Sequence, residues 1–236
     1  MRRFPIVLMA IMVTAFSGCE KEKLIMLSAT STALHHGETY QIPAQCDNPI
    51  TYTSVDEYHA NVSASGLITA QYVGNTTIRL TSEDDTKTFS VTVISRSNLY
   101  PEPNIKVGDT RSTVISKLGQ PDASTSDGIG YNNYSTKAPM LAVLFDANNR
   151  VKGYGIMVLS AYSSELSTFI RERYAYVTMN EGSPIFINSL TAAGATLLVS
   201  YEYYNTNYWM VTYLPYSNKD CLDLSEIKAV LDVLEN

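Results

Sequence analysis

The chain has 236 residues, with 17 Lys or Arg against 23 Asp or Glu, and a formal net charge of −6 at pH 7. Its apolar fraction of 45% is that of a folded protein, which excludes wholesale disorder, and its length suits one large domain or two small ones. The acidic balance argues against a nucleic-acid-binding protein, because phosphate binding needs a clustered basic face.

Residues 1–18 have the pattern of a secretory signal peptide. Arg2 and Arg3 precede an apolar stretch over 4–16, which is shorter than the roughly 20 residues that a membrane-spanning helix needs. The sequence Phe16-Ser17-Gly18-Cys19 resembles the lipobox of bacterial lipoproteins, although Phe stands at the usual position of Leu. The resemblance implies that Cys19 is acylated, with palmitate among its lipids, and becomes the new N-terminus. An ordinary signal peptide with a chance cysteine is the alternative.

Cleavage before Cys19 leaves 218 residues with 15 basic and 23 acidic side chains, a net charge of −8. Residues 19–23 form a short charged tether that resembles the one carrying some outer-membrane lipoproteins to the outer face, and a plain solvated linker is the alternative. We therefore expect a lipid anchor in the outer membrane and exposure at the cell surface. The inner and outer faces stay open as alternatives.

Residues 24–95 are expected to form an all-β sandwich. Short β-prone runs occur at 40–46, 76–80 and 88–93, separated by turn residues. The segments 51–54, 60–63 and Gly66-Leu67-Ile68-Thr69-Ala70, followed by Gly74, resemble the group 2 bacterial immunoglobulin-like domain, with Tyr52 where that family usually has a core Trp. The resemblance implies an immunoglobulin-like fold and a role in adhesion or as a spacer.

Residues 96–103 are the expected linker, and 104–236 are expected to form an α+β domain with helices packed on an antiparallel sheet. The first expected elements are a helix from Asp109 or Thr110 to Leu118, strands at 140–145 and 151–158, and a helix from Ser163 or Ser164. Strands are then expected at 176–179, 185–188, 196–204 and 208–214. The last expected element is a C-terminal helix with Leu224, Ile227, Val230, Leu231 and Leu234 on one face. Residues 107–121 and 145–151 resemble the small assembly-lipoprotein and β-lactamase-inhibitor-like fold, which implies a protein-binding scaffold.

Tyr is unusually frequent, with 17 residues against one Trp and six Phe. With residues 205–207 as a loop, Tyr203 opposes Trp209, Tyr201 opposes Val211 and Val199 opposes Tyr213, which predicts one apolar, core-facing side of a hairpin. Tyr204, Tyr208 and Tyr216 are the candidate surface for binding a protein or glycan, because Tyr offers a large contact area at low entropic cost.

No catalytic motif is found. The three histidines, His35, His36 and His59, all precede residue 100, so the C-terminal part has no Ser/His or Cys/His pair, and no metal site or cofactor is expected. Glu165, Glu172, Glu181 and Glu202 are expected to be solvated, although a pair of carboxylates for glycoside hydrolysis stays open. Cys46 and Cys221 either form a disulfide or leave Cys46 as a buried thiol.

We therefore expect a non-catalytic lipoprotein of the cell envelope that binds a glycan or a protein at the cell surface. A scaffold or inhibitor-like protein acting on other envelope proteins from the periplasmic face is the first alternative, and a carbohydrate-active enzyme is the second.

Overall fold

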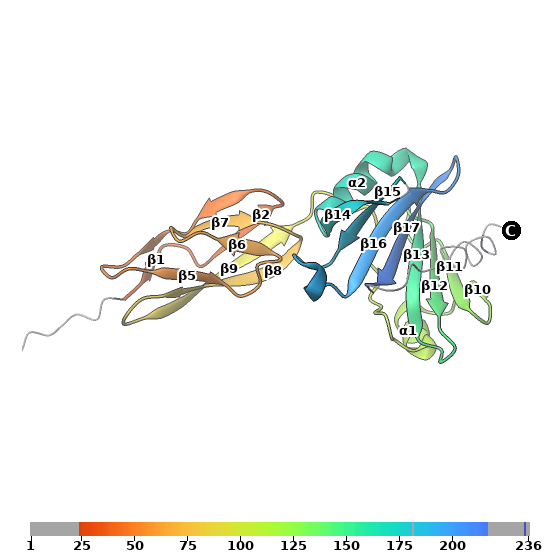
Figure 1. Ribbon diagram of the computed structural model, residues 1–236, viewed down its shortest axis with the longest axis horizontal. Coiled ribbons are helices and arrows are strands. Elements are labelled where there is room, and N and C mark those ends of the chain that lie inside the picture. The colour runs from red at the N-terminus through yellow and green to blue at the C-terminus, as the bar shows by residue number, and fades with distance from the viewer. Residues whose placement is uncertain (1–23, 181, 217–233, 235–236) are drawn as a thin grey trace, which may run out of the picture.

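The structure is a computed structural model that describes residues 24–180, 182–216 and 234. Its strands gather into two groups at opposite ends of an elongated molecule (Figure 1). We call residues 24–94 the N-terminal sandwich and the single sheet within residues 123–215 the C-terminal sheet.

The N-terminal sandwich is built from three small sheets. A four-stranded sheet has the order β2-β9-β8-β5, a three-stranded sheet has the order β3-β7-β6, and β1 pairs with β4. The strands are β1 (Met26–Leu27), β2 (Ser31–His35), β3 (Thr39–Gln41), β4 (Ala44–Gln45), β5 (Thr51–Ser54), β6 (Ala60–Val62), β7 (Leu67–Ala70), β8 (Gly74–Thr81) and β9 (Thr86–Ile94). β2 runs parallel to β9, and the other pairs are antiparallel.

Alternating side chains explain the core of the N-terminal sandwich. In β8 and β9, Ile78, Leu80, Phe89, Val91 and Val93 are all buried, and the residues between them point outward. The single strand expected at 40–46 is instead two short strands, because Pro43 has no main-chain N–H to donate to a ladder.

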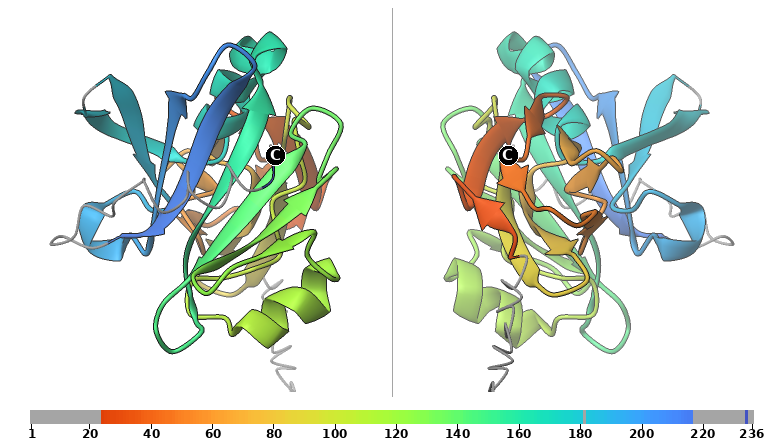
Figure 2. Two further views of the ribbon diagram at one scale, coloured as in Figure 1. Left: turned by 90° about the vertical axis from the view of Figure 1, so that its right-hand side faces the viewer. Right: turned by 90° about the vertical axis from the view of Figure 1, so that its left-hand side faces the viewer.

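The C-terminal sheet has eight antiparallel strands in the order β10-β11-β12-β13-β17-β16-β15-β14. Figure 2 shows that this sheet is strongly twisted. The elements in chain order are α1 (Arg111–Leu118), β10 (Ala123–Ser124), β11 (Gly128–Asn132), β12 (Met140–Phe145), β13 (Val151–Leu159), a 3₁₀ turn (Ser160–Tyr162), α2 (Ser163–Arg171), β14 (Ala175–Asn180), β15 (Ser183–Ile187), a 3₁₀ turn (Ala192–Gly194), β16 (Leu197–Tyr203) and β17 (Tyr208–Pro215).

Both faces of the central strands are buried. Every residue of β12 is buried, which explains its unbroken apolar run Met140 to Phe145. One face contributes Leu141, Val143, Ile156, Val211 and Tyr213 to the main core, together with side chains from α1 and α2. The other face, which we call the methionine face, consists of Met140, Ala142, Leu144, Met157, Met210 and Leu214, and Leu234 packs against it.

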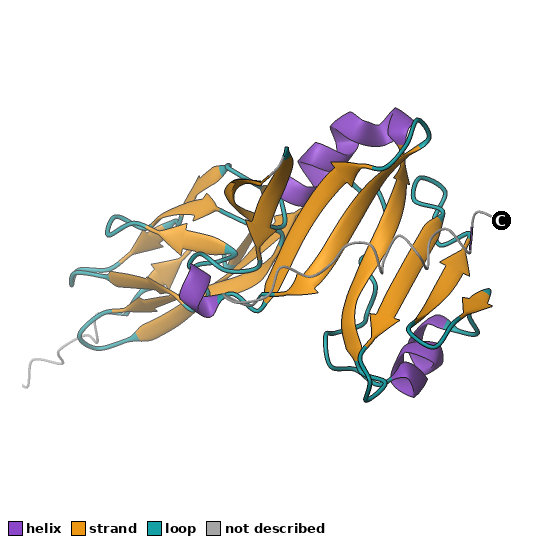
Figure 3. Cartoon of the chain, turned by 45° about the vertical axis from the view of Figure 1, so that its right-hand side comes forward, coloured by secondary structure: helices purple, strands orange, loops and turns teal. Residues whose placement is uncertain are grey.

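The expected α+β domain with helices packed on an antiparallel sheet is wrong, because residues 104–216 are mostly β. α1 and α2 have eight and nine residues, which at 1.5 Å per residue span about 12–14 Å. Eight strands spaced about 4.8 Å apart span roughly 34 Å, so the two helices cannot form a layer over the sheet. They lie at opposite ends of it (Figure 3). The helix expected around Leu224 to Leu231 lies outside the described residues, and of its apolar stripe only Leu234 is described.

The two parts of the molecule are joined by hydrogen bonds at the C-terminal end of α2. The main-chain oxygen of Glu172 accepts from the N–H of Val73 at 2.8 Å, and that of Arg173 accepts from the hydroxyl of Tyr58 at 2.7 Å. Tyr58 stacks on Tyr72 with 4.7 Å between ring centroids. Glu172 is the C-cap of α2 and Arg173 follows it, so the N-terminal sandwich supplies donors to the two carbonyl groups directly after the helix.

The carboxylate of Glu172 holds the first residues of the expected linker. Its side chain is buried, and it accepts from the main-chain N–H of Arg96 at 2.8 Å and of Ser97 at 3.1 Å. The guanidinium of Arg173 lies 2.6 Å from the same carboxylate. Further along the expected linker, Leu99 and Tyr100 are buried in the main core, so this segment packs against the C-terminal sheet.

Candidate binding site at the tips of two hairpins

The hairpin of β16 and β17 has the predicted register. Tyr203 pairs with Trp209, Tyr201 with Val211 and Val199 with Tyr213. The predicted core face is also confirmed, because Val199, Val211 and Tyr213 belong to the main core. Tyr203 is the exception on that face, since it lies at the hairpin tip and is 57% exposed.

The three tyrosines of the predicted binding surface lie in different places. Tyr204 and Tyr208 are half-buried and pack against the methionine face at the hairpin tip. Tyr216 follows the other end of β17, where its N–H donates to the main-chain oxygen of Thr196 at 3.0 Å. Tyr208 begins the eight-residue strand β17 and Tyr216 directly follows it, so the two lie roughly 26 Å apart along the strand. The structure therefore brings Tyr204 and Tyr208 together but not Tyr216.

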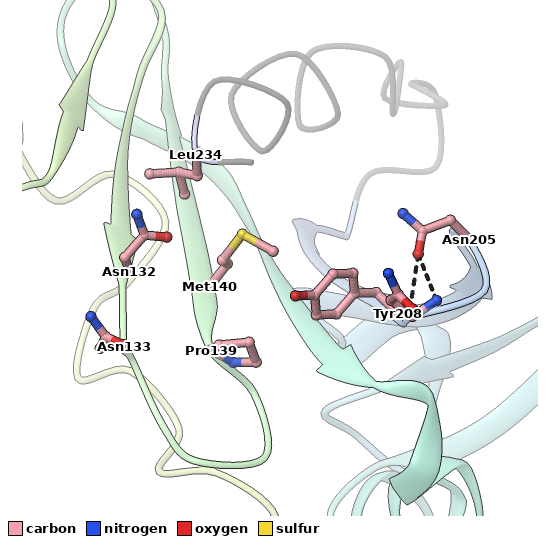
Figure 4. A pocket seen from close by; sticks show the side chains of 8 residues that line it. Asn132, Asn133, Pro139, Met140, Asn205, Tyr208 and Leu234 are labelled. Atoms are coloured by element: carbon pink, nitrogen blue, oxygen red, sulfur yellow. Dashed lines mark hydrogen bonds between the residues drawn. The ribbon is translucent and has the colours of Figure 1, made fainter. Parts of the chain in front are cut away.

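A pocket of about 610 Å³ opens beside Tyr208. Apart from Leu234, its described lining comes from the tips of two hairpins, the one of β11 and β12 and the one of β16 and β17, which lie at the same end of the sheet with β13 between them (Figure 4). The described lining residues are Asn132, Asn133, Pro139, Met140, Asn205, Asn207, Tyr208 and Leu234. None of these carries a charge, so the described lining offers amide groups, a phenol ring and apolar side chains.

Hydrogen bonds fix the shape of the loop between β16 and β17. The side-chain oxygen of Asn205 accepts from the N–H of Asn207 at 2.9 Å and of Tyr208 at 3.1 Å, which closes an Asx turn. The main-chain oxygen of Asn207 accepts from the N–H of Ser160 at 2.8 Å, so the loop is also tied to the end of β13.

The loop between β11 and β12 is held in a similar way. The N–H of Tyr134 donates to the main-chain oxygen of Pro139, and that of Ser135 to Ala138, both at 3.0 Å. Asn133 adopts a φ of 56°, in the left-handed region that Asn tolerates better than most residues. Sequence reasoning missed Asn132 and Asn133 as site residues, because the only signal that the pair carries is that of a turn.

A cluster of buried tyrosines lies away from the pocket, on the core side of the sheet. The hydroxyls of Tyr100 and Tyr213 lie 2.7 Å apart, and the ring of Tyr154 stacks on that of Tyr213 at 4.6 Å between centroids. The hydroxyl of Tyr174 donates to the carboxylate of Glu102. Burial raises the pKa of Tyr100, Tyr154, Tyr174 and Tyr213, and the nearby negative charge of Glu102 raises it further. These tyrosines therefore hold the segment after β9 to the sheet.

The histidines have structural contacts. Nδ1 of His35 lies 3.1 Å from the main-chain oxygen of Ile94, Nδ1 of His59 lies 3.1 Å from that of Tyr72, and His36 contacts that of Gln71. Among the residues that the structure describes, no group of three His, Cys, Asp or Glu side chains stands close enough to hold a metal ion. No helix within the described ranges has both the length and the apolar character needed to cross a membrane.

Two of the candidate carboxylates meet at Ser97, whose hydroxyl donates to Glu165 at 3.2 Å and whose N–H donates to Glu172 at 3.1 Å, away from the pocket lining. The carboxylate of Glu165 also accepts a hydrogen bond from the ammonium group of Lys137 at 2.8 Å. Glu202 is half-buried in β16. The expectation that Glu172 is solvated is wrong, because it is 3% exposed and accepts two main-chain N–H groups. Glu181 lies outside the described residues.

Of the three cysteines, only Cys46 lies among the described residues. Cys46 is half-buried and packs against the core of the N-terminal sandwich. Cys19 and Cys221 lie outside the described residues, so both the lipid attachment and a bridge between Cys46 and Cys221 stay predictions.

Residues 23–93 match the family model of the Bacterial Ig-like domain (group 2). This segment is a bacterial Ig-like domain. The match confirms the resemblance seen at residues 51–74, and it places the sheets of the N-terminal sandwich within one Ig-like domain. It ends before the C-terminal sheet, so the pocket lies outside the matched residues.

No curated protein matches the chain. Solved structures that resemble it include an intimin mutant from EHEC O157:H7, with 16% identity over 68% of this chain and 75% of that chain and a TM-score of 0.24. Domains 5–6 of the S-layer protein SbsC have 15% identity, cover 84% and 86%, and have a TM-score of 0.25. Human protocadherin-24 EC1-2 has 13% identity, covers 81% and 94%, and has a TM-score of 0.25. Identities and TM-scores this low transfer no property to the chain.

Proposed function

We propose that the chain is a non-catalytic lipoprotein of the cell envelope, anchored to the outer membrane through Cys19, which binds a ligand at the cell surface with its C-terminal sheet. The signal-peptide pattern and the residues before Cys19 support the anchor. The Ig-like domain stands between the N-terminus and the C-terminal sheet, which supports a role as a spacer (Figure 1).

The observation that carries a binding role is the pocket at the two hairpin tips. It is formed by loops that hydrogen bonds hold in place, so little conformational entropy would be lost when a ligand binds. Its described lining contains Asn amides and Tyr208 but no side chain that commonly serves as a nucleophile or a general base at neutral pH. This lining suits recognition better than catalysis.

Protease treatment of intact cells tests the surface placement. Digestion of the chain on intact cells supports it, whereas full protection until the outer membrane is opened contradicts it. Incorporation of labelled palmitate tests the anchor: Cys19→Ser should abolish the label, and Cys46→Ser, the matched control, should keep it.

The exposed edge strand β14 favours a second candidate function, that of a scaffold on the periplasmic face. β14 is the edge strand of the C-terminal sheet, and Tyr176, Val177 and Met179 on it are about half exposed, at 50%, 49% and 53%. An exposed apolar edge strand can pair with a strand of another protein. If Val177→Lys disrupts a complex with an envelope protein while the pocket variants described below do not, the scaffold is the better account.

A further inference from the structure

We propose that the pocket binds a neutral glycan, whose hydroxyl groups are recognised by the amides of Asn132, Asn133 and Asn207. This inference rests on the proposed binding function and names the class of its ligand. Side-chain amides suit the task because each offers two donors and an acceptor, which matches neighbouring sugar hydroxyls that both donate and accept.

The amides are placed for a ligand rather than for the fold. Asn132, Asn133 and Asn207 are exposed, and within the described part of the chain their side chains form no hydrogen bond. Asn205 differs, because its side-chain oxygen is already engaged by two N–H groups of its own loop. The pocket thus divides its asparagines into one that shapes the loop and three that face outward.

An apolar floor lies beside these amides. Tyr208 presents its ring towards Met140, and Pro139 lies next to it on the neighbouring loop (Figure 4). The C–H face of a pyranose ring packs well against such apolar and aromatic groups, while its hydroxyls stay at the rim. The combination of rigid aromatic contact and adaptable amides is also what recognition surfaces use.

The charge of the site argues for a neutral ligand. No Lys or Arg is among the described residues that line the pocket, and the chain as a whole is acidic. A sulfated or sialylated glycan would lose hydration at its anionic group without gaining a cationic partner, which is unfavourable.

The sheet topology argues against a peptide ligand at this pocket. An extended peptide gains affinity by pairing its main chain with an open sheet edge. The pocket lies at the ends of β11, β12 and β17, and none of its described lining residues belongs to β10 or β14, the two edge strands of the sheet. Side chains, not main-chain groups, therefore do the recognition here.

The test uses the full chain, purified in detergent, on an array that carries neutral, sulfated and sialylated oligosaccharides, with titration calorimetry on the strongest neutral glycan. We expect neutral glycans to bind. Asn132→Ala and Asn207→Ala should each weaken that binding about tenfold, the effect of losing one or two hydrogen bonds. Asn148→Ala is the matched control, because Asn148 is exposed in the turn between β12 and β13, away from the pocket lining, and should bind as the wild type does.

Unchanged melting temperatures of the variants would show that the loss is local. Binding to anionic glycans alone, or neutral binding that Asn132→Ala and Asn207→Ala leave intact, would overturn the glycan assignment. Binding of a purified matrix protein without any glycan binding would also overturn it, while the proposed surface-binding function would stand. No binding to any glycan or matrix protein would count against both.

Discussion

Replacing Glu172 by Ala should be among the most destabilising single changes in the chain. The carboxylate accepts main-chain N–H groups from Arg96 and Ser97 and lies 2.6 Å from the guanidinium of Arg173. Hydrogen bonds to a charged group contribute about 1.5–3 kcal/mol each, and breaking a buried ion pair costs about 3–5 kcal/mol. We expect a loss of about 4 kcal/mol in the free energy of unfolding, a large part of the roughly 5–15 kcal/mol that holds a typical domain.

Equilibrium unfolding in urea measures this loss with two independent probes. Trp209 is the only Trp of the chain and lies in the C-terminal sheet, so its fluorescence reports that sheet, whereas circular dichroism reports both parts. We expect the two transitions to coincide in the wild type and to separate in Glu172→Ala. Glu57→Ala, at an exposed carboxylate of the Ig-like domain, should change the free energy by less than about 0.5 kcal/mol. A loss below about 1 kcal/mol in Glu172→Ala, with coincident transitions, would refute this account of the junction.

Three further predictions concern the two cores. Gly74→Ala should destabilise the Ig-like domain more than Gly37→Ala does in thermal unfolding, because both glycines have positive φ but only at Gly74 would a Cβ collide with the ring of His59. Tyr100→Phe should cost about 1–3 kcal/mol in urea unfolding, because it leaves the buried hydroxyl of Tyr213 without its partner, and an unchanged midpoint would contradict this. The raised pKa of Tyr154 and Tyr213 favours their neutral form in the folded state, so their contribution to stability should be complete below pH 10 and be lost as the pH rises above it. Denaturation at pH 8 to 11.5 measures that loss, and a stability that stays level to pH 11.5 would contradict it.

Local patterns predicted the elements well, and the reason is visible in the hairpin of β16 and β17. A one-residue slip would mix its apolar and polar faces, and a two-residue slip would keep the faces but misplace the turn at 205–207, so the pattern predicts the register that is observed. The boundaries of β12 also follow from its apolar run over residues 140–145. β11 escaped prediction because Gly128 and Gly130 interrupt the β-prone pattern, and pairing with β12 overrides the weak propensity of glycine.

Only part of the candidate site could be predicted from the sequence, because local patterns predict single hairpins but not which hairpins become neighbours. Tyr208 and the loop at 205–207 follow from the hairpin, but Asn132 and Asn133 are more than 70 residues away in the sequence. What brings the two loops together is the order β11-β12-β13-β17, which places the last hairpin next to strands formed much earlier. No local pattern encodes that order. The same holds for Tyr58 and Val73, whose partners directly after α2 lie about 100 residues further along the chain.

The parallel pairing of β2 with β9 has a mechanical consequence. A pull between the N-terminus and the C-terminal sheet enters the Ig-like domain through the two-residue strand β1, reaches the start of β2, and leaves the domain just after β9. Because the two strands are parallel neighbours, paired from Ser31 with Ser90 to His35 with Ile94, the pull acts along the ladder and must slide the strands past each other. All the hydrogen bonds of the ladder then resist together instead of opening one at a time. A protein tethered at one end and holding a ligand at the other would bear tension along its strongest direction.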